Sequence, residues 1–275
     1  MTGGAGPTVD RAMATTLIEE LTDIVVHAGA AILAIDRRAM TMDGKSDGSP
    51  VTAADLAADR VIADGLARLL PDVPVLSEER APPAAPARTS SFFLIDPLDG
   101  TKEFIAGRDE FTVNLALVTD GVPLLGIIGA PALGLIWRGL VGGGAERLEI
   151  REGAVSAATP IRTRRAPERG RIIAVSRSHA DNRTEAFIAD WPDAVRQVAG
   201  SALKFCRVAE GAADVYPRLA PTREWDVAAG HAVVTAAGGK VVTSSGAELR
   251  FDGRGEDFLV PEFVAWGDPA AVRRP

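Results

Sequence analysis

Residues 92–101 read Phe-Phe-Leu-Ile-Asp-Pro-Leu-Asp-Gly-Thr. The apolar start predicts a buried strand, and two carboxylates three residues apart stand where that strand stops. Hard divalent cations prefer oxygen ligands, and Mg²⁺ is usually held by one or two carboxylates together with phosphate oxygens. Pro97 fixes one φ angle, and Gly100 lets backbone N–H groups approach an anion closely. The stretch therefore suggests a site for metal and phosphate, although by itself it fits a turn rich in Asp, Pro and Gly equally well.

The composition is that of a globular chain of 275 residues, with 47% hydrophobic and 24% charged residues. This length allows one large domain or two modest ones. A net charge of −7 argues against a general binder of nucleic acid or anionic membranes, which needs a surplus of Lys and Arg. The single Cys206 excludes an intrachain disulfide and a Cys-rich zinc site, and it fits a reducing cytosol. Residues 1–10 are Gly-rich and predict a short disordered lead rather than a secretory signal.

The apolar periodicity predicts alternating helices and strands along the chain. The uncharged run 121–137 is interrupted by Pro and Gly, so it predicts paired buried strands and no integral membrane segment. A basic stretch at 162–171 marks the expected boundary between an N-terminal α+β half, residues 11–165, and a C-terminal α/β half, residues 166–275. The expected elements are a helix over 10–40, a helix from Thr52 to Pro71 whose apolar residues are Leu56, Val61, Ile62, Leu66 and Leu69, a strand over 73–76, an antiparallel meander over 111–141, a helix over 182–189, a strand over 194–198, and helices over 201–210 and 226–237.

Further acidic residues stand at the ends of these expected elements. Asp55 follows Thr52 at a helix start, where it also fits a capping box. Glu78 and Glu79 follow a strand end and also fit a solvated turn. Asp226 opens the last helix and also fits an N-cap. Their order along the chain is what favours a shared site over four separate local roles.

That order resembles the inositol monophosphatase superfamily of metal-dependent, lithium-sensitive phosphatases. The resemblance spans nearly the whole chain after the lead. It is carried by Lys45, residues 52–55, Ser77-Glu78-Glu79, residues 96–101, and Trp225-Asp226 with Ala228-Ala229-Gly230.

Within the superfamily the chain resembles the CysQ branch, the 3′(2′),5′-bisphosphate nucleotidases. Lys102-Glu103-Phe104 follows residues 96–101, which we call the central motif. Inositol phosphatases usually carry Asn-Phe there, after one variable residue. The segments 175–179, 200–206 and 209–226 are also similar to CysQ. The resemblance implies the layered αβαβα sandwich of the superfamily, an α/β (α+β) fold with the site between its two halves.

The resemblance also implies roles for individual residues. Two Mg²⁺ ions are expected, with a third, weaker ion held by Glu78 and water. Asp55 and Thr101 would orient a water and accept its proton, with Glu78 completing the catalytic set. The first ion would be bound by Glu78, Asp96 and the Leu98 carbonyl, and the second by Asp96, Asp99 and Asp226. The substrate would also meet Gly100 and Thr101 through their N–H groups, and the nucleotide with its second phosphate would meet Ser178, His179, Ser201, Lys204 and Arg218.

The substrate so implied is adenosine 3′,5′-bisphosphate, cleaved to AMP and phosphate as part of nucleotide recycling in sulfur assimilation. Its 5′-phosphosulfate form is a second expected substrate. Two alternatives stay open: an inositol-1-phosphate or histidinol-phosphate monophosphatase on the same fold, and a nucleotide sensor that does not hydrolyse its ligand. No nucleic-acid partner is expected, the oligomeric state is not predicted, and a cytoplasmic location is expected, with peripheral association at the inner membrane face left open.

Overall fold

The structure is a computed structural model, and it describes residues 8–37, 43–44, 50–80, 90–177, 181–252 and 257–272. Its largest sheet has seven strands in the order β3-β4-β5-β6-β7-β8-β9. All neighbouring strands are antiparallel except β3 and β4, which run parallel. The strands are β3 (Val75–Ser77), β4 (Ser91–Asp99), β5 (Thr112–Thr119), β6 (Val122–Ala130), β7 (Leu135–Leu140), β8 (Gly144–Arg151) and β9 (Ala154–Ile161).

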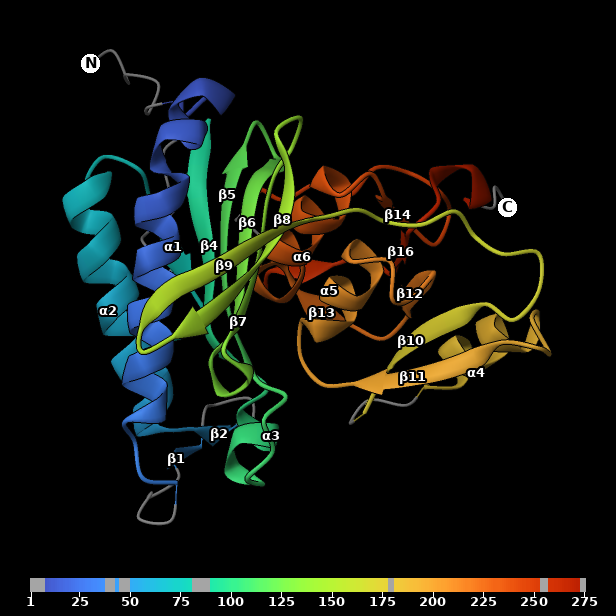
Figure 1. Ribbon diagram of the computed structural model, residues 1–275, viewed down its shortest axis with the longest axis horizontal. Helices are drawn as coiled ribbons and strands as arrows, with labels where there is room; N and C mark the ends of the chain where they lie inside the picture. The colour runs from blue at the N-terminus through green and yellow to red at the C-terminus, as the bar shows by residue number, and fades with distance from the viewer. Residues whose placement is uncertain are drawn as a thin grey trace.

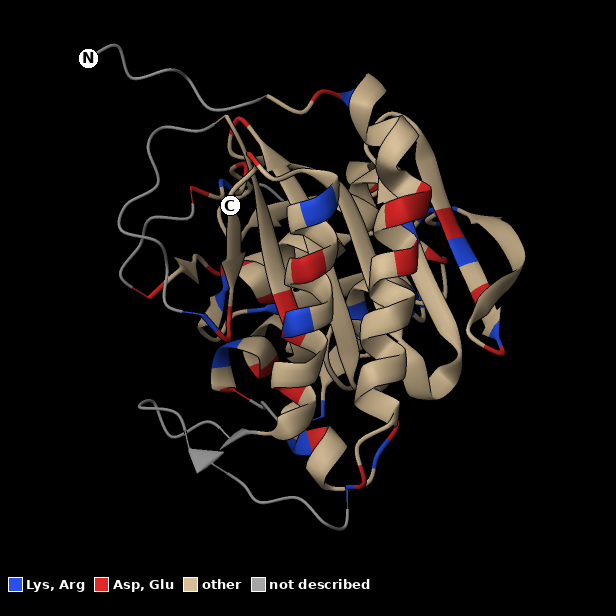
Figure 2. Ribbon diagram, turned by 90° about the vertical axis from the view of Figure 1, so that its left-hand side faces the viewer, with Lys and Arg blue, Asp and Glu red and all other residues tan. Residues whose placement is uncertain are grey.

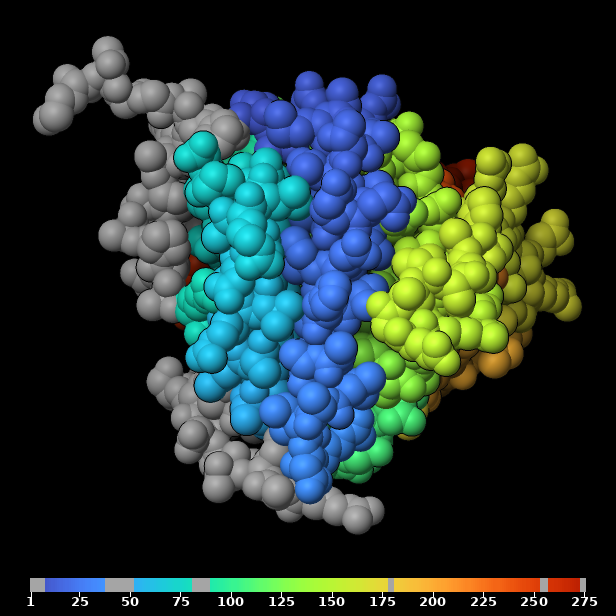
Figure 3. Space-filling view, turned by 60° about the vertical axis from the view of Figure 1, so that its left-hand side comes forward, coloured from blue at the N-terminus to red at the C-terminus, as the bar shows by residue number. Residues whose placement is uncertain are grey.

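Helices cover both faces of this sheet (Figure 1). On one face lie α1 (Arg11–Leu33) and α2 (Ala53–Leu69), which pack side by side, with the β8–β9 hairpin next to α1 (Figure 3). Along the outward surface of α2 acidic and basic residues alternate, whereas the charged residues of α1 after Arg11 are acidic (Figure 2). On the other face lie α5 (Leu203–Ala209) and α6 (Glu224–Ala236).

A second sheet lies beyond α5 and α6, with its strands in the order β11-β10-β12-β16-β14. Helix α4 (Asn182–Ala189) covers its outer face, where Ile188 and Trp191 pack on Ile173 and Val215. The layers are therefore α, β, α, β, α, as expected for the αβαβα sandwich. The strands are β10 (Ile172–Ser176), β11 (Val195–Ala199), β12 (Val215–Arg218), β14 (Lys240–Thr243) and β16 (Phe263–Trp266).

The remaining elements are short. They are the strand pairs β1 (Asp43–Gly44) with β2 (Pro50–Val51) and β13 (Thr222–Arg223) with β15 (Leu259–Val260), the helix α3 (Thr101–Ile105), and the 3₁₀ turns η1 (Pro131–Leu133) and η2 (Pro269–Ala271). Among the described helices, none is long and apolar enough to cross a membrane.

Glycines in the large sheet let α6 approach it closely. A Cβ at Gly126 would lie 2.2 Å from the Ala229 carbonyl oxygen, and one at Gly139 would lie 2.8 Å from the Val233 Cα. Neither position has room for a side chain, because real Cβ atoms do not come so near to backbone atoms. The close packing brings the first turn of α6, with Asp226, towards the end of β4.

The predicted boundary near residue 165 falls in the connection between the two sheets, since the first ends at Ile161 and the second begins at Ile172. The hydrophobic core does not divide there. One cluster of buried residues joins Leu94 and Trp137 of the large sheet to Phe205 of α5 and Phe263 of the second sheet. The halves therefore share the helix layer between them.

Several expected elements differ in detail from the observed ones. Helix α1 ends at Leu33 rather than Met40. The prediction was too long because Ile35, which follows the helix in a turn, still packs on the core and so continues the apolar pattern.

Of the apolar residues expected on α2, Ile62 and Leu66 are buried, whereas Leu56 is 53% exposed. Asp55 and Asp59 also lie on the inward face of the helix. Strands β8 and β9 were not predicted: most side chains of β9 are exposed, and β8 mixes buried, half-buried and exposed side chains without a clean apolar pattern.

Candidate functional site

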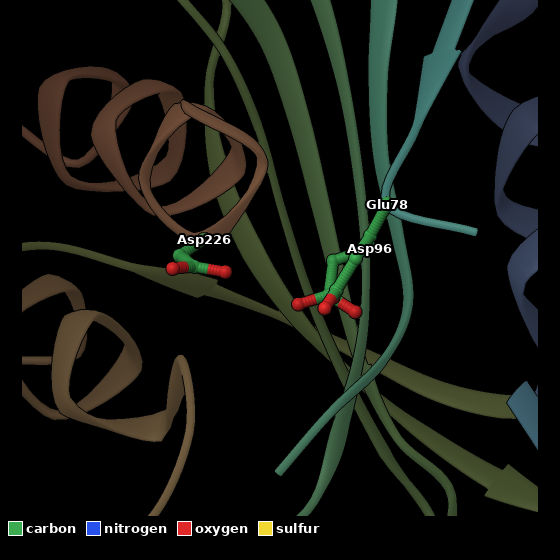
Figure 4. Close-up of side chains that lie close together, drawn as sticks. All are labelled: Glu78, Asp96 and Asp226. Carbon is green, nitrogen blue, oxygen red and sulfur yellow. The ribbon is translucent and has the colours of Figure 1, made fainter. Parts of the chain in front are cut away.

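An acidic cluster stands at the end of the large sheet. Ligand oxygens of Glu78, Asp96 and Asp226 all lie within 4.8 Å of one another. Glu78 follows β3, Asp96 lies in β4, and Asp226 comes from α6; their carboxylates converge on one space (Figure 4). Because β3 and β4 are parallel neighbours, their carboxyl ends meet at the same edge of the sheet.

The central motif lies on the last, irregular part of β4 rather than after it. The pairing of β4 with β5 is regular up to Asp96 and resumes only at Asp99, so the intervening Pro97 and Leu98 form a bulge. The Leu98 N–H donates to Asp96 Oδ1 at 3.1 Å. Asp99 lines the same cavity as Asp96. We call Glu78, Asp96, Asp99 and Asp226 the acidic edge.

Asp99 and Asp226 are each held by neutral donors rather than by cations. Asp99 Oδ2 accepts hydrogen bonds from Asn114 Nδ2 at 3.3 Å and from the Thr112 hydroxyl at 3.4 Å. Asp226 Oδ2 accepts the Thr222 hydroxyl at 2.6 Å and the Arg223 N–H at 3.0 Å. Asp226 is the third residue of α6, which begins at Glu224, and so it is not the N-cap that the sequence had allowed.

Two carboxyl groups of the acidic edge, Asp96 and Asp99, have raised pKa values. Burial, followed by the charges of Glu78 and Asp99, raises the pKa of Asp96 well above its usual value. Burial and the charge of Asp226 raise the pKa of Asp99 to about 7, although Lys204 opposes the rise. Four oxygen-donor side chains that line one cavity fit a hard divalent cation, which would relieve the repulsion between their charges.

Asp55 has a cap role and a second contact as well. Its Oδ2 accepts the Thr52 N–H at 2.8 Å and the Thr52 hydroxyl at 2.6 Å, which is the capping box at the start of α2. Its Oδ1 accepts from the Thr101 hydroxyl at 3.2 Å. That hydroxyl also lies 3.2 Å from the Leu98 carbonyl oxygen. Because one oxygen is held by the cap, the other stays aimed at the start of α3.

Asp59, which the sequence analysis did not single out, braces the segment that carries Glu78. Its carboxylate accepts the Ser77 hydroxyl and Arg80 Nε, both at 2.6 Å. It lies one helical turn after Asp55 on the buried face of α2 and is 6% exposed. The only sign in the sequence was that Asp59 lies four residues after Asp55, which places both acids on one face of a helix. Nothing in the sequence indicated that Ser77 and Arg80 would bind Asp59.

Gly100 permits a close contact between the two halves. Its φ is +92°, and a Cβ there would lie 2.1 Å from Ser201 Oγ. The Ser201 hydroxyl lies 2.9 Å from the carbonyl oxygens of both Asp99 and Glu110. Its one proton is thus engaged by backbone acceptors, so Ser201 ties the segments together and can meet a nucleotide only as an acceptor.

Cationic side chains line the same cavity as the acidic edge; its volume is about 330 Å³, and Gly100 and Thr101 are also in its wall. We call Lys204, Arg218 and Arg223 the cationic rim. Lys204 is 5% exposed, and its ammonium donates to the carbonyls of Ser201 and Ala199. Burial lowers its pKa to about 8, against the opposing charge of Asp99.

Arg218 contributes two further features of the rim. Its Nη2 donates to the Pro221 carbonyl at 3.2 Å, and its Nε is buried without a partner among the described residues. Of the expected nucleotide-binding residues, Ser178 and His179 lie outside the described residues, and so does Lys45 of the family motif. The structure thus brings Lys204, Arg218 and Ser201 to the cavity wall and leaves Ser178 and His179 as predictions.

The comparisons with known proteins point to one family. Residues 13–269 match the model of the inositol monophosphatase family. The chain is 43% identical over 251 residues to the 3′(2′),5′-bisphosphate nucleotidase CysQ of Escherichia coli O157:H7, a match that covers 90% of this chain and 98% of that protein. The Salmonella typhimurium protein of the same name is 42% identical over 251 residues, with the same coverage.

A solved structure agrees with the sequence comparisons. The crystal structure of CysQ from Bacteroides thetaiotaomicron, a bacterial member of the inositol monophosphatase family, is similar with a TM-score of 0.78 and 36% sequence identity. The match covers 91% of this chain and 97% of that one. The likeness therefore extends over both sheets and the helix layer between them.

Proposed function

Because this chain belongs to the inositol monophosphatase family, we propose that it is a divalent-cation-dependent phosphatase that removes the 3′-phosphate of adenosine 3′,5′-bisphosphate, giving AMP and phosphate. The observation that carries the proposal is that the four acidic side chains of the edge and the three cationic side chains of the rim line one cavity. The acidic edge suits the cations and the reacting phosphate, while the cationic rim suits a second phosphate that is not cleaved.

We assign the cation ligands within the acidic edge. Glu78, Asp96 and the Leu98 carbonyl would hold one Mg²⁺, and Asp96, Asp99 and Asp226 a second, with a third, weaker ion at Glu78 and water. Asp96, the most buried of the four acids, would be shared. When bound, such ions neutralise phosphate oxygens and lower the pKa of a nearby water, so that no protein nucleophile is needed.

Asp55 and Thr101 would move the proton. Because the Thr101 hydroxyl donates to Asp55 Oδ1, its oxygen lone pairs are available to accept a hydrogen bond from water. As the water gives up its proton to Thr101 Oγ1, Thr101 can pass its own proton to Asp55. The Thr52 contacts to Asp55 Oδ2 hold the acceptor in place, which is the requirement for general-base catalysis.

Backbone groups at Gly100 and Thr101 would hold the phosphate. These residues start α3, so their N–H groups have no acceptor one turn earlier in that helix. The αL conformation of Gly100 leaves this backbone free of a Cβ on the side that faces Ser201. The phosphate is thus expected between the acidic edge and the first turn of α3.

The cationic rim favours a bisphosphate nucleotide over an inositol monophosphate. A ligand with one phosphate would leave Lys204 and Arg218 without an anion, whereas a 5′-phosphate or a 5′-phosphosulfate would meet them. The names of the relatives at 42–43% identity point to the same substrate class. Lys102 and Glu103 also line the cavity, at the position where the sequence differs from inositol phosphatases.

The proposal is tested by Mg²⁺-dependent phosphate release from adenosine 3′,5′-bisphosphate, its 5′-phosphosulfate form, inositol 1-phosphate and histidinol phosphate. The expected kcat/KM is highest for the two nucleotides. A higher value for either of the other two would favour a monophosphatase on the same fold. Tight nucleotide binding without phosphate release would instead favour a sensor.

We place the protein in the cytoplasm and expect no nucleic-acid partner. Its single cysteine, Cys206, is buried in the helix layer and unpaired, which suits a reducing compartment. The substrate class is a small diffusible anion, and the cationic rim is matched to that charge.

A further inference from the structure

Glu110 joins the two halves beside the cavity without lining it. It precedes β5 in the N-terminal half, and its carboxylate accepts Arg177 Nε and Nη2, both at 2.8 Å. The same carboxylate accepts the Gly200 N–H at 2.9 Å, and its backbone carbonyl accepts the Ser201 hydroxyl at 2.9 Å. One residue thus binds two separate segments of the C-terminal half.

The backbones at this junction touch. A Cβ at Gly200 would lie 2.7 Å from the Glu110 carbonyl oxygen, so this position has no room for a side chain. Ser201 adopts a φ of +47°, which a non-glycine residue rarely does without strong local restraint. The contacts from Glu110 and Asp99 supply that restraint.

The junction leads directly to the cationic rim. The Ser201 carbonyl accepts the Lys204 ammonium, and Ala199, at the end of β11, accepts it at 3.4 Å. A shift of Gly200 and Ser201 would therefore move the acceptors that fix Lys204. Lys204 lines the cavity, whereas Glu110 is not among the residues in its wall. Glu110 reaches Lys204 through these backbone contacts instead, and its charge also acts on Lys204.

Stability alone does not account for the pair formed by Glu110 and Arg177. The hydrogen bond to Arg177 lowers the pKa of Glu110, but the two side chains are 28% and 37% exposed. Exposed ion pairs add little to folding, since solvent and salt screen them. The pair formed by Glu185 of α4 and Arg196 of β11 has the same bidentate geometry, at 2.8 and 2.7 Å, and neither residue lines the cavity.

We propose that Glu110 is a positioning residue that holds Lys204 at a fixed distance from the acidic edge, and so sets the preference of the enzyme for a substrate with a second phosphate. This inference rests on the proposed function. It assigns the preference to a residue of the N-terminal half, although the cationic side chain that meets the ligand belongs to the other half.

The test compares adenosine 3′,5′-bisphosphate with adenosine 3′-monophosphate, which offers the same phosphate for cleavage but lacks the second one. Glu110→Ala is expected to raise KM for the bisphosphate about tenfold, equivalent to about 1.4 kcal/mol, with kcat nearly unchanged. KM for the monophosphate should stay as it was. Arg177→Ala keeps the Gly200 hydrogen bond, so we expect a smaller rise. Glu185→Ala, the matched control, should change neither substrate.

A double variant tests whether Glu110 acts through Lys204. Lys204→Met alone removes the cation, so adding Glu110→Ala to it should cause no further loss for the bisphosphate. Fully additive losses would overturn the inference, as would equal losses for both substrates or a Glu110→Ala enzyme that behaves like Glu185→Ala. A wild-type enzyme without preference for the bisphosphate would instead contradict the proposed function, before any variant is made.

Discussion

The acidic edge and the cationic rim face the same cavity but are built in different ways. The acids of the edge stand on the end of a long, buried sheet and on the first turn of a helix packed closely against it. Lys204 of the rim is instead held by backbone carbonyls, which are fixed by contacts from the other half. The edge is therefore expected to keep its geometry when one of its acids changes, whereas the rim depends on how the halves meet.

The largest effect is expected from removing the shared acid of the edge. Asp96→Asn should lower kcat/KM by about 10³-fold or more, because several kcal/mol of charge stabilisation depend on the bound cations. The same change removes a buried, repelled carboxylate, so the melting temperature of the metal-free protein should not fall. Phosphate release measures kcat/KM, and calorimetry measures the melting temperature. Asp120→Asn, in the exposed turn after β5, is the control and should alter neither.

The next effect concerns proton transfer at the edge. Thr101→Val should lower kcat by about 10²-fold, the lower range for loss of general-base catalysis, with KM little changed. Thr101→Ser keeps the hydroxyl that donates to Asp55 and should recover most of the rate. Steady-state kinetics decides, and a valine variant with near-normal kcat would rule out this path for the proton.

A smaller effect is expected at the rim. Lys204→Met keeps the volume and the burial of the side chain but removes its charge, so KM for adenosine 3′,5′-bisphosphate should rise about tenfold or more, as expected for one lost charged hydrogen bond. The rate with inositol 1-phosphate should hardly change. Lys240→Met, an exposed lysine on β14, is the control. Equal losses with both substrates would mean that Lys204 supports the edge rather than the second phosphate.

The smallest expected effect is a pH dependence of the melting temperature that comes from Asp99 of the acidic edge. Asp99 has a folded-state pKa of about 7, above its usual 3.8. Its contribution to the stability of the metal-free protein is therefore present at low pH and lost as pH rises through 7. Lowering the pH from 8 to 6 should raise the melting temperature of the metal-free protein by a few degrees, since about 1 kcal/mol moves it by about 2–4 °C at this size.

The same titration predicts how Mg²⁺ acts. Because protons compete with the cation for the acidic edge, Mg²⁺ should stabilise the protein more at pH 8 than at pH 6. Scanning calorimetry with and without Mg²⁺ measures both trends. A stabilisation by Mg²⁺ that does not depend on pH would mean that the ion binds elsewhere.

The sequence predicted the acidic edge better than the rim, and the reason is physical. Asp96 and Asp99 lie within residues 92–101. Glu78 and Asp226 stand at the ends of predicted elements, and their carboxylates are ligands that suit a metal ion. The meander of β5 to β7 was predicted from the apolar pattern, and the structure shows it. The layered fold was predicted from the family resemblance, and the fold comparison confirms it. The roles of Asp55, Thr101 and the metal ligands stay predictions, although the structure brings these residues together.

The residues that escaped prediction act through tertiary contacts. Glu110 and Asp59 lie in no recognised motif, and Arg177 lies in a segment similar to CysQ that gives no sign of its partner. The partners of these residues lie 18 to 91 positions away along the chain. The same holds for α2, whose buried face carries Asp55 and Asp59 while Leu56 is exposed. The apolar pattern includes the buried Ile62 and Leu66, but it gives no sign that Asp55 and Asp59 are buried on the same face.

The most direct test of the division between edge and rim is to identify the product. The purified protein is incubated with adenosine 3′,5′-bisphosphate and Mg²⁺, and the nucleotide formed is resolved by chromatography alongside both adenosine monophosphates. Our account predicts 5′-AMP and one equivalent of phosphate, with no turnover after the cation is chelated. Adenosine 3′-monophosphate as the product would contradict it, because the phosphate that we place on the cationic rim would then be the one that is cleaved.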